Sequence, residues 1–177
     1  MQTQVHPLEP FFRQAVRTSY EDKLGINDPE MTGYVAHMLC EFTEVGNIHK
    51  LCDELGRPIE DLEEMIHASD PVHGLASSFD AERSMRRSIG DYALFVAGIY
   101  PETTLTGSRL RPSLGELIRV GKESYHIVSQ FNLFEYEEEA PLFARLSDSF
   151  ERCILGLALV REELGTTNML PKPSDLQ

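Results

Sequence analysis

Apolar residues recur every three to four positions along nearly the whole 177-residue chain, and no stretch alternates convincingly between apolar and polar residues. This spacing is typical of α-helices that bury one face, whereas a half-buried strand has a period of two. A chain of this length can bury about 70% of its unfolded surface, so it needs no disulfide or metal to fold. We therefore predict an all-α fold: a single-domain bundle of six to seven helices over residues 1–164, followed by a mobile polar tail at 165–177.

The least polar helix is predicted at about residues 79–98. Its large apolar residues lie on one face, and Gly90, Ala93 and Ala97 form a neighbouring strip of small residues. A helix of this kind allows a second helix to pack closely against it. We therefore expect this helix to be the centre of the hydrophobic core.

Capping residues indicate where several other helices begin and end. Gly25 is suited to the end of a first helix over residues 8–23, and Asp28 to the N-cap of the next helix. Ser113 and Glu116 have the spacing of a capping box, which predicts a helix start. Further helices are predicted at residues 48–55, 59–66 and 140–164, with an acidic link at 131–139 before the last one.

The formal net charge of the chain is −13 at pH 7. Nucleic-acid binding depends on Lys and Arg side chains that neutralise phosphates, so we expect neither a nucleic-acid partner nor binding to an anionic membrane. The longest apolar stretch, residues 92–101, is about half of what a membrane-spanning helix requires. The first residues lack the pattern of a secretory signal and three cysteines cannot all pair, so we expect reduced thiols in the cytoplasm.

The segment from Arg87 to Glu102 contains the pattern Gly-Asp-x-Ala-Leu-Phe-x-x-Gly-x-x-Pro-Glu. It resembles the central helix of a bacterial all-helical family that carries this pattern. The segment from Arg119 to Tyr125 is similar to the downstream Met-Gly-x-x-x-Tyr segment of that family, with Val120 where Met is usual. The resemblance covers about residues 30 to 164 and implies a helical fold. The family has no established activity, so the resemblance implies no reaction.

Asp91 lies one helical turn after Arg87 and two turns after Arg83, so the three side chains share one edge of the predicted central helix. A buried carboxylate needs a cationic or hydrogen-bonding partner. We predict an Arg–Asp pair that stabilises the helix. The alternative is a ligand-binding site at Arg83, Arg87 and Asp91 for an anionic metabolite.

Two His-x-x-Cys pairs, His37–Cys40 and His49–Cys52, contain the ligand types that zinc prefers. Helical spacing places His37 and Cys40 on a solvent-facing side with Glu44, whereas Cys52 falls on a core face. Because the two pairs point to different environments, we expect Cys40 to be exposed and no zinc to bind. A zinc site that includes His37 and Cys40 is the alternative.

Two Glu-x-x-His pairs, Glu64–His67 and Glu123–His126, match ligands that di-iron helical bundles use. Such a site needs two more carboxylates from other helices, for which Glu44 and Glu82 are candidates. The segment that holds Glu64 is short, however, and the inner helix faces are filled by aliphatic residues. We therefore expect no iron; a di-iron oxidoreductase is the alternative.

The run Glu135-Tyr-Glu-Glu-Glu139 lacks the spacing of a calcium loop. We expect a solvated link, with a docking patch for a basic partner as the alternative. No phosphate-binding loop or nucleophile elbow is present. Phe11, Phe12 and Tyr20 give the first helix more aromatic surface than an edge helix needs. We therefore expect a non-enzymatic protein that forms a homodimer or binds another protein; a metal- or small-ligand-binding domain is the alternative.

Overall fold

The computed structural model describes residues 7–43, 62–102 and 112–165. Across these ranges the chain forms seven α-helices, one π-helical turn and one 3-10 turn, and no β-strand. The predicted all-α bundle is therefore confirmed. None of the helices in these ranges has the length and hydropathy needed to cross a membrane. The predictions for residues 48–55, His49, Cys52 and the tail beyond Gly165 lie outside the described residues.

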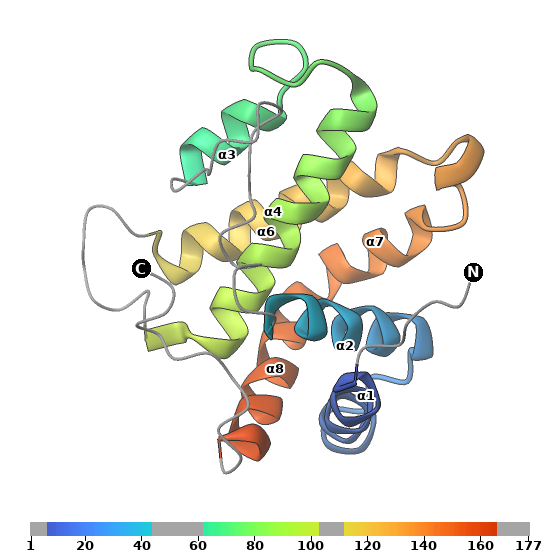
Figure 1. The fold of residues 1–177 in the computed structure, drawn as a ribbon, viewed down its shortest axis with the longest axis vertical. Helices are drawn as coiled ribbons and strands as arrows, with labels where there is room; N and C mark the ends of the chain where they lie inside the picture. Colours follow the sequence, from blue (N-terminus) through green and yellow to red (C-terminus); the bar gives the residue numbers. More distant parts are fainter. Residues whose placement is uncertain (1–6, 44–61, 103–111, 166–177) are drawn as a thin grey trace.

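Helix α4 (Phe79–Ile99) runs through the middle of the molecule, as predicted for this segment (Figure 1). It packs most extensively against α6 (Leu114–Gln130) and α8 (Phe150–Leu164), and α3 (Leu62–Ser69) covers part of its remaining surface. Ser78 caps its start, because the Ser78 hydroxyl accepts a backbone hydrogen bond of 3.1 Å from the first turn. The central helix thus has a defined beginning and four helical neighbours, because α2 (Pro29–Thr43) also contacts it.

Glycines allow α6 and α8 to approach α4 closely. A Cβ atom built on Gly90 would lie 2.5 Å from the Tyr125 ring of α6. One built on Gly98 would lie 2.5 Å from the Cβ atom of Leu157 on α8. These distances are far below van der Waals contact, so a larger residue would force the helices apart. Gly90 of the predicted small-residue strip therefore forms a contact surface, and Gly98 forms a second one that was not part of the predicted strip.

The first predicted helix is divided into α1 (Glu9–Arg17) and a π-helical turn, η1 (Thr18–Lys23). A π turn changes the direction of the side chains that follow it relative to a uniform α-helix. Tyr20 in this turn is fully buried, and its hydroxyl donates a hydrogen bond of 2.8 Å to the carbonyl oxygen of Cys153 on α8. Gly25 ends the segment with a φ of +66°, in the conformation predicted for a helix-terminating glycine.

The predicted single helix over residues 140–164 is wrong. The chain forms α7 (Ala140–Asp148) and α8, which meet at Ser149 with φ −102° and ψ 15°. Serine and aspartate are weak helix formers, and Ser147 uses its hydroxyl to donate a hydrogen bond of 2.9 Å to the Lys122 carbonyl oxygen on α6. The change of direction lets α7 pack on α6 while α8 packs on α4 and η1 (Figure 1).

Candidate functional sites: a buried carboxylate network and an apolar tip

Asp91 lies at the buried junction of α4, α6 and α2 (Pro29–Thr43) and is 9% exposed. Its Oδ1 atom accepts hydrogen bonds of 2.6 Å from the Tyr34 hydroxyl on α2 and 2.7 Å from the Tyr125 hydroxyl on α6. Arg87 donates through Nε to the Tyr34 hydroxyl at 3.1 Å. Arg87 thus reaches Asp91 through the Tyr34 hydroxyl, where the sequence predicts a direct pair along the helix.

Burial controls the charges of this network. It raises the pKa of Asp91 to about 6, although the two tyrosine hydroxyls and the charge of Arg87 act in the opposite direction. Burial and the neighbouring carboxylate raise the pKa values of Tyr34 and Tyr125 well above the ordinary value, so both hydroxyls remain donors at neutral pH. These bonds join three helices and give the Asp91 carboxylate partners from its own chain.

The two segments that carry the family resemblance meet at this network. Gly90 leaves room for the Tyr125 ring, and the adjacent Asp91 accepts its hydroxyl. At the other end of the pattern, Glu102 accepts two hydrogen bonds from Arg161 on α8, at 2.8 and 2.9 Å. Contacts between helices thus explain why Gly90, Asp91 and Glu102 occupy these positions. Membership in the family stays a prediction.

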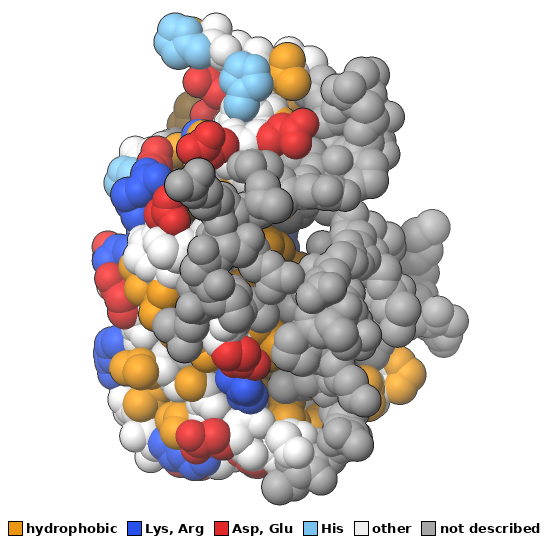
Figure 2. Space-filling view, turned by 90° about the vertical axis from the view of Figure 1, so that its left-hand side faces the viewer, with side chains coloured by type: hydrophobic (Ala, Val, Ile, Leu, Met, Phe, Trp, Pro, Cys, Tyr) orange, Lys and Arg blue, Asp and Glu red, His pale blue; other side chains and the backbone are white. Residues whose placement is uncertain are grey.

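The structure does not bring the predicted iron ligands together. Glu64 and His67 are exposed on α3, and Glu123 and His126 are exposed on α6. Figure 2 shows acidic and histidine side chains standing on the surface at the end of the molecule that carries α3. Within residues 7–43, 62–102 and 112–165, no three His, Cys, Asp or Glu side chains form a group that could hold a metal ion. Glu123 instead forms an ion pair on the surface of α6, with its Oε2 atom 3.5 Å from the Nη1 atom of Arg119.

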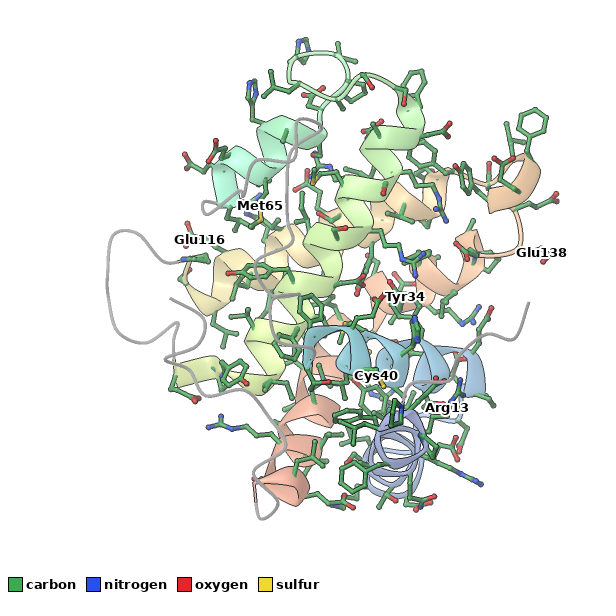
Figure 3. All side chains as sticks on the ribbon, in the orientation of Figure 1. Arg13, Tyr34, Cys40, Met65, Glu116 and Glu138 are labelled. Atoms are coloured by element: carbon green, nitrogen blue, oxygen red, sulfur yellow. The ribbon has the colours of Figure 1, made fainter. Side chains whose placement is uncertain are left out.

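Cys40 is buried, which corrects the prediction that it shares a solvent-facing side with His37. His37 is exposed, with its Nε2 atom 3.8 Å from Glu41 Oε1. Helix α2 packs on two sides, because α1, which carries Arg13, lies beside the part of α2 that carries Cys40 (Figure 3). A Cβ atom built on Gly33 would lie 3.5 Å from Arg13 of α1. Periodicity alone could not predict this second contact.

The aromatic surface predicted for the first helix is largely absent. Phe12 and Tyr20 are fully buried, and Phe11 alone of the three is exposed, at 36%. Phe12 and Tyr20 belong to the main hydrophobic core, which also includes residues of α2, α4 and α8. The interpretation of these residues as an interaction surface is therefore wrong for two of the three.

Five exposed apolar side chains lie instead on the segment that leads into α4, at the first residue of α4, and on the link before α7. Both segments lie near the N-terminal end of α4 (Figure 1). The exposed fractions of these side chains range from 55% for Leu75 to 87% for Phe134. Three other large apolar residues are exposed in the described parts of the chain, one each on α1, α6 and α8. Five residues define what we call the apolar tip: Val72, Leu75, Phe79, Leu133 and Phe134.

Polar contacts hold the link of residues 131–139 against the start of α4. The Tyr136 hydroxyl donates a hydrogen bond of 3.1 Å to Asp80 Oδ1. Arg83 is buried, donates to Glu139 at 2.7 Å and places its guanidinium carbon 4.0 Å from the centre of the Tyr136 ring. Arg83 therefore anchors this link, although the sequence groups it with Arg87 and Asp91.

Phe134 has a φ of 55° and is the one non-glycine residue with positive φ in the described ranges. For a residue with a bulky side chain, this left-handed conformation costs about 1–2 kcal/mol. Burial of the ring does not offset that cost, because 87% of the side chain is exposed. The positive φ starts the 3-10 turn Phe134–Tyr136, which leads to the anchoring Tyr136 while the Phe134 side chain stays exposed. Strained backbone of this kind is enriched at binding sites.

Comparisons of the chain with family models, with curated proteins and with solved structures give no match. The function therefore has to be inferred from the carboxylate network and the apolar tip themselves.

Proposed function

We propose that this protein acts by binding a polypeptide partner through the apolar tip, and not by catalysing a reaction. One observation carries the proposal: five large apolar side chains are exposed at one end of a bundle that buries most others. Folded monomers rarely expose apolar side chains in groups, and such groups are typical of interaction sites. The carboxylate network, in contrast, has its hydrogen-bonding groups engaged between helices.

The anchoring of the tip supports this role. Leu133 and Phe134 precede Tyr136, which is bonded to Asp80 and covered by the Arg83 guanidinium. A loop held in this way loses less conformational entropy when it binds than a free loop would. Aromatic side chains on a preorganised surface are frequent sources of binding energy in protein interfaces.

A displayed random-peptide library tests the proposal, because it offers the tip many partner sequences at once. The library is selected on the wild-type protein and counter-selected on the Phe79→Ser/Phe134→Ser variant. Both rings are exposed, so we expect the variant to retain its circular dichroism spectrum and unfolding midpoint. The matched control is Leu155→Ser, which removes an apolar side chain that is 58% exposed on α8.

We expect enriched peptides that bind the wild type and the Leu155→Ser variant but lose at least about tenfold in affinity for the tip variant. A library that yields no such peptide, or peptides that bind all three proteins equally, would overturn the proposal.

A further inference from the structure

We infer that the partner of the apolar tip presents a basic amphipathic segment, in which lysine or arginine side chains surround apolar ones. This inference rests on the proposed function and adds the chemistry of the partner. It follows from the charges around the tip, which differ from those on the rest of the described surface.

The two stretches that carry the tip contain acidic side chains and one histidine, His73, but no Lys or Arg. Residues 70–82 and 131–141 hold seven Asp and Glu residues and no Lys or Arg. The nearest arginines along α4, Arg83 and Arg86, are each only 7% exposed, and Arg83 is paired with Glu139. Among the described residues, the buried Arg83 and Arg86 supply the nearby positive charge, and Arg86 acts on Asp70 and Glu82.

Carboxylates elsewhere are more often matched with basic side chains of the same chain. Ion pairs of this kind join Glu9 to Arg13, Glu21 to Arg17, Asp28 and Glu30 to Arg145, Glu102 to Arg161, Glu123 to Arg119 and Glu151 to Lys122. At the tip, Glu135, Glu137 and Glu138 are exposed and make no ion pair with the described residues. The described part of the chain therefore leaves the charges of these three carboxylates, beside Leu133 and Phe134, without a paired cation.

The negative charge of the tip favours some binding partners over others. A second copy of the chain would place like charges together, and an anionic membrane surface would be repelled for the same reason. A segment with apolar and basic side chains can pack on the exposed apolar residues and pair with the adjacent glutamates. Charges within about 8–10 Å act on one another at physiological ionic strength, so carboxylates adjacent to the apolar residues contribute to the encounter.

Three synthetic peptides test the inference by fluorescence anisotropy. Each is an 18-residue amphipathic helix with the same leucine face and carries lysine, glutamine or glutamate on its polar face. The proteins are the wild type, the Phe79→Ser/Phe134→Ser variant and the charge variant Glu135→Gln/Glu137→Gln/Glu138→Gln. A matched charge control, Asp22→Asn/Glu64→Gln/Glu162→Gln, removes three exposed carboxylates that lie outside the two tip stretches and have no ion pair in the described structure.

We expect the lysine peptide to bind the wild type at least about tenfold more tightly than the glutamine peptide, and the glutamate peptide not to bind. The charge variant should lose about tenfold in affinity for the lysine peptide, whereas the charge control should lose less than about twofold. Raising the sodium chloride concentration from about 0.05 to about 0.5 M should remove most of the preference for lysine.

Equal binding of the lysine and glutamine peptides, each lost in the Phe79→Ser/Phe134→Ser variant, would overturn the basic chemistry and leave apolar docking at the tip intact. Lysine-peptide binding that survives in that variant would overturn docking at the tip as well. Sedimentation velocity provides a separate outcome, because a wild-type dimer that the tip variant loses would identify a second copy as the partner and exclude a basic one.

Discussion

The two ends of α4 differ in how their side chains are used. Toward its C-terminal end, glycines receive neighbouring side chains and Asp91 is hydrogen-bonded by two tyrosines from other helices. At its first turns Phe79 is exposed, and in the adjoining link three exposed glutamates make no ion pair with the described residues and Phe134 has a strained backbone. The first region is closely packed and its buried polar groups are hydrogen-bonded, as in a stable core. The second region exposes apolar side chains, which a stable surface usually does not. Departures that internal packing does not explain are typical of functional sites.

Truncation of one aromatic ring in each region should give the largest contrast. We expect Tyr125→Ala to lower the free energy of unfolding by about 4 kcal/mol, because it leaves a cavity and removes a donor from Asp91. Phe134→Ala should change it by less than about 0.5 kcal/mol, because the ring is exposed. Urea unfolding measures both. A similar loss in the two variants would show that the tip is part of the folding core.

The close contact at Gly90 should give the next largest effect. We expect Gly90→Ala to destabilise the protein by about 2 kcal/mol, because the added methyl group overlaps the Tyr125 ring. Gly115→Ala is the matched control in α6, since no atom lies within 4 Å of its Cβ position. That control should leave stability unchanged or raise it slightly, because alanine favours helix. Thermal unfolding compares the two, and an undiminished midpoint for Gly90→Ala would contradict close packing of the Tyr125 ring on this glycine.

The titration of Asp91 gives a smaller, pH-dependent effect. The folded-state pKa of about 6 lies above the ordinary value of 3.8, so this carboxyl adds stability at low pH that is lost as pH rises through 6. Asp91→Asn keeps an acceptor for the tyrosines but cannot ionise. From pH 5 to pH 8, the unfolding free energy of the wild type should therefore fall by roughly 1.4 kcal/mol relative to that of the variant. Urea unfolding at both pH values checks this, and a pH-independent difference would contradict it.

The smallest effect is expected from the strain at Phe134. Glycine adopts positive φ without a steric penalty, whereas alanine does not, so Phe134→Gly should be more stable than Phe134→Ala by about 1 kcal/mol. The comparison of two variants that both lack the ring isolates the backbone contribution. Equal unfolding midpoints in urea would show that the conformation at this position carries no strain.

The sequence predicted the parts of the fold that depend on local chemistry. The caps at Asp28 and Ser113, the terminating Gly25 and the central helix are present as expected. Each of these features depends on residues within one or two turns, which a single sequence displays directly.

Features that depend on tertiary contacts were missed. The pair of Arg87 and Asp91 is visible from spacing, but Tyr34, which lies between them, is 57 residues away from Asp91. Cys40 is buried because a second helix covers α2, and Val72 is exposed because nothing in the described part of the chain covers its loop. Hydrophobic periodicity describes one face of one helix, so it predicts neither a second buried face nor an uncovered apolar loop.

The contacts between glycines and rings also constrain how the sequence can diverge. A side chain can appear at such a glycine only if the opposite ring becomes smaller, so the two positions should change together during evolution. Paired changes of this kind could identify distant homologues after overall identity has faded. Three pairs are suited to such a search: Gly90 with Tyr125, Gly121 with Phe150, and Gly156 with Tyr20.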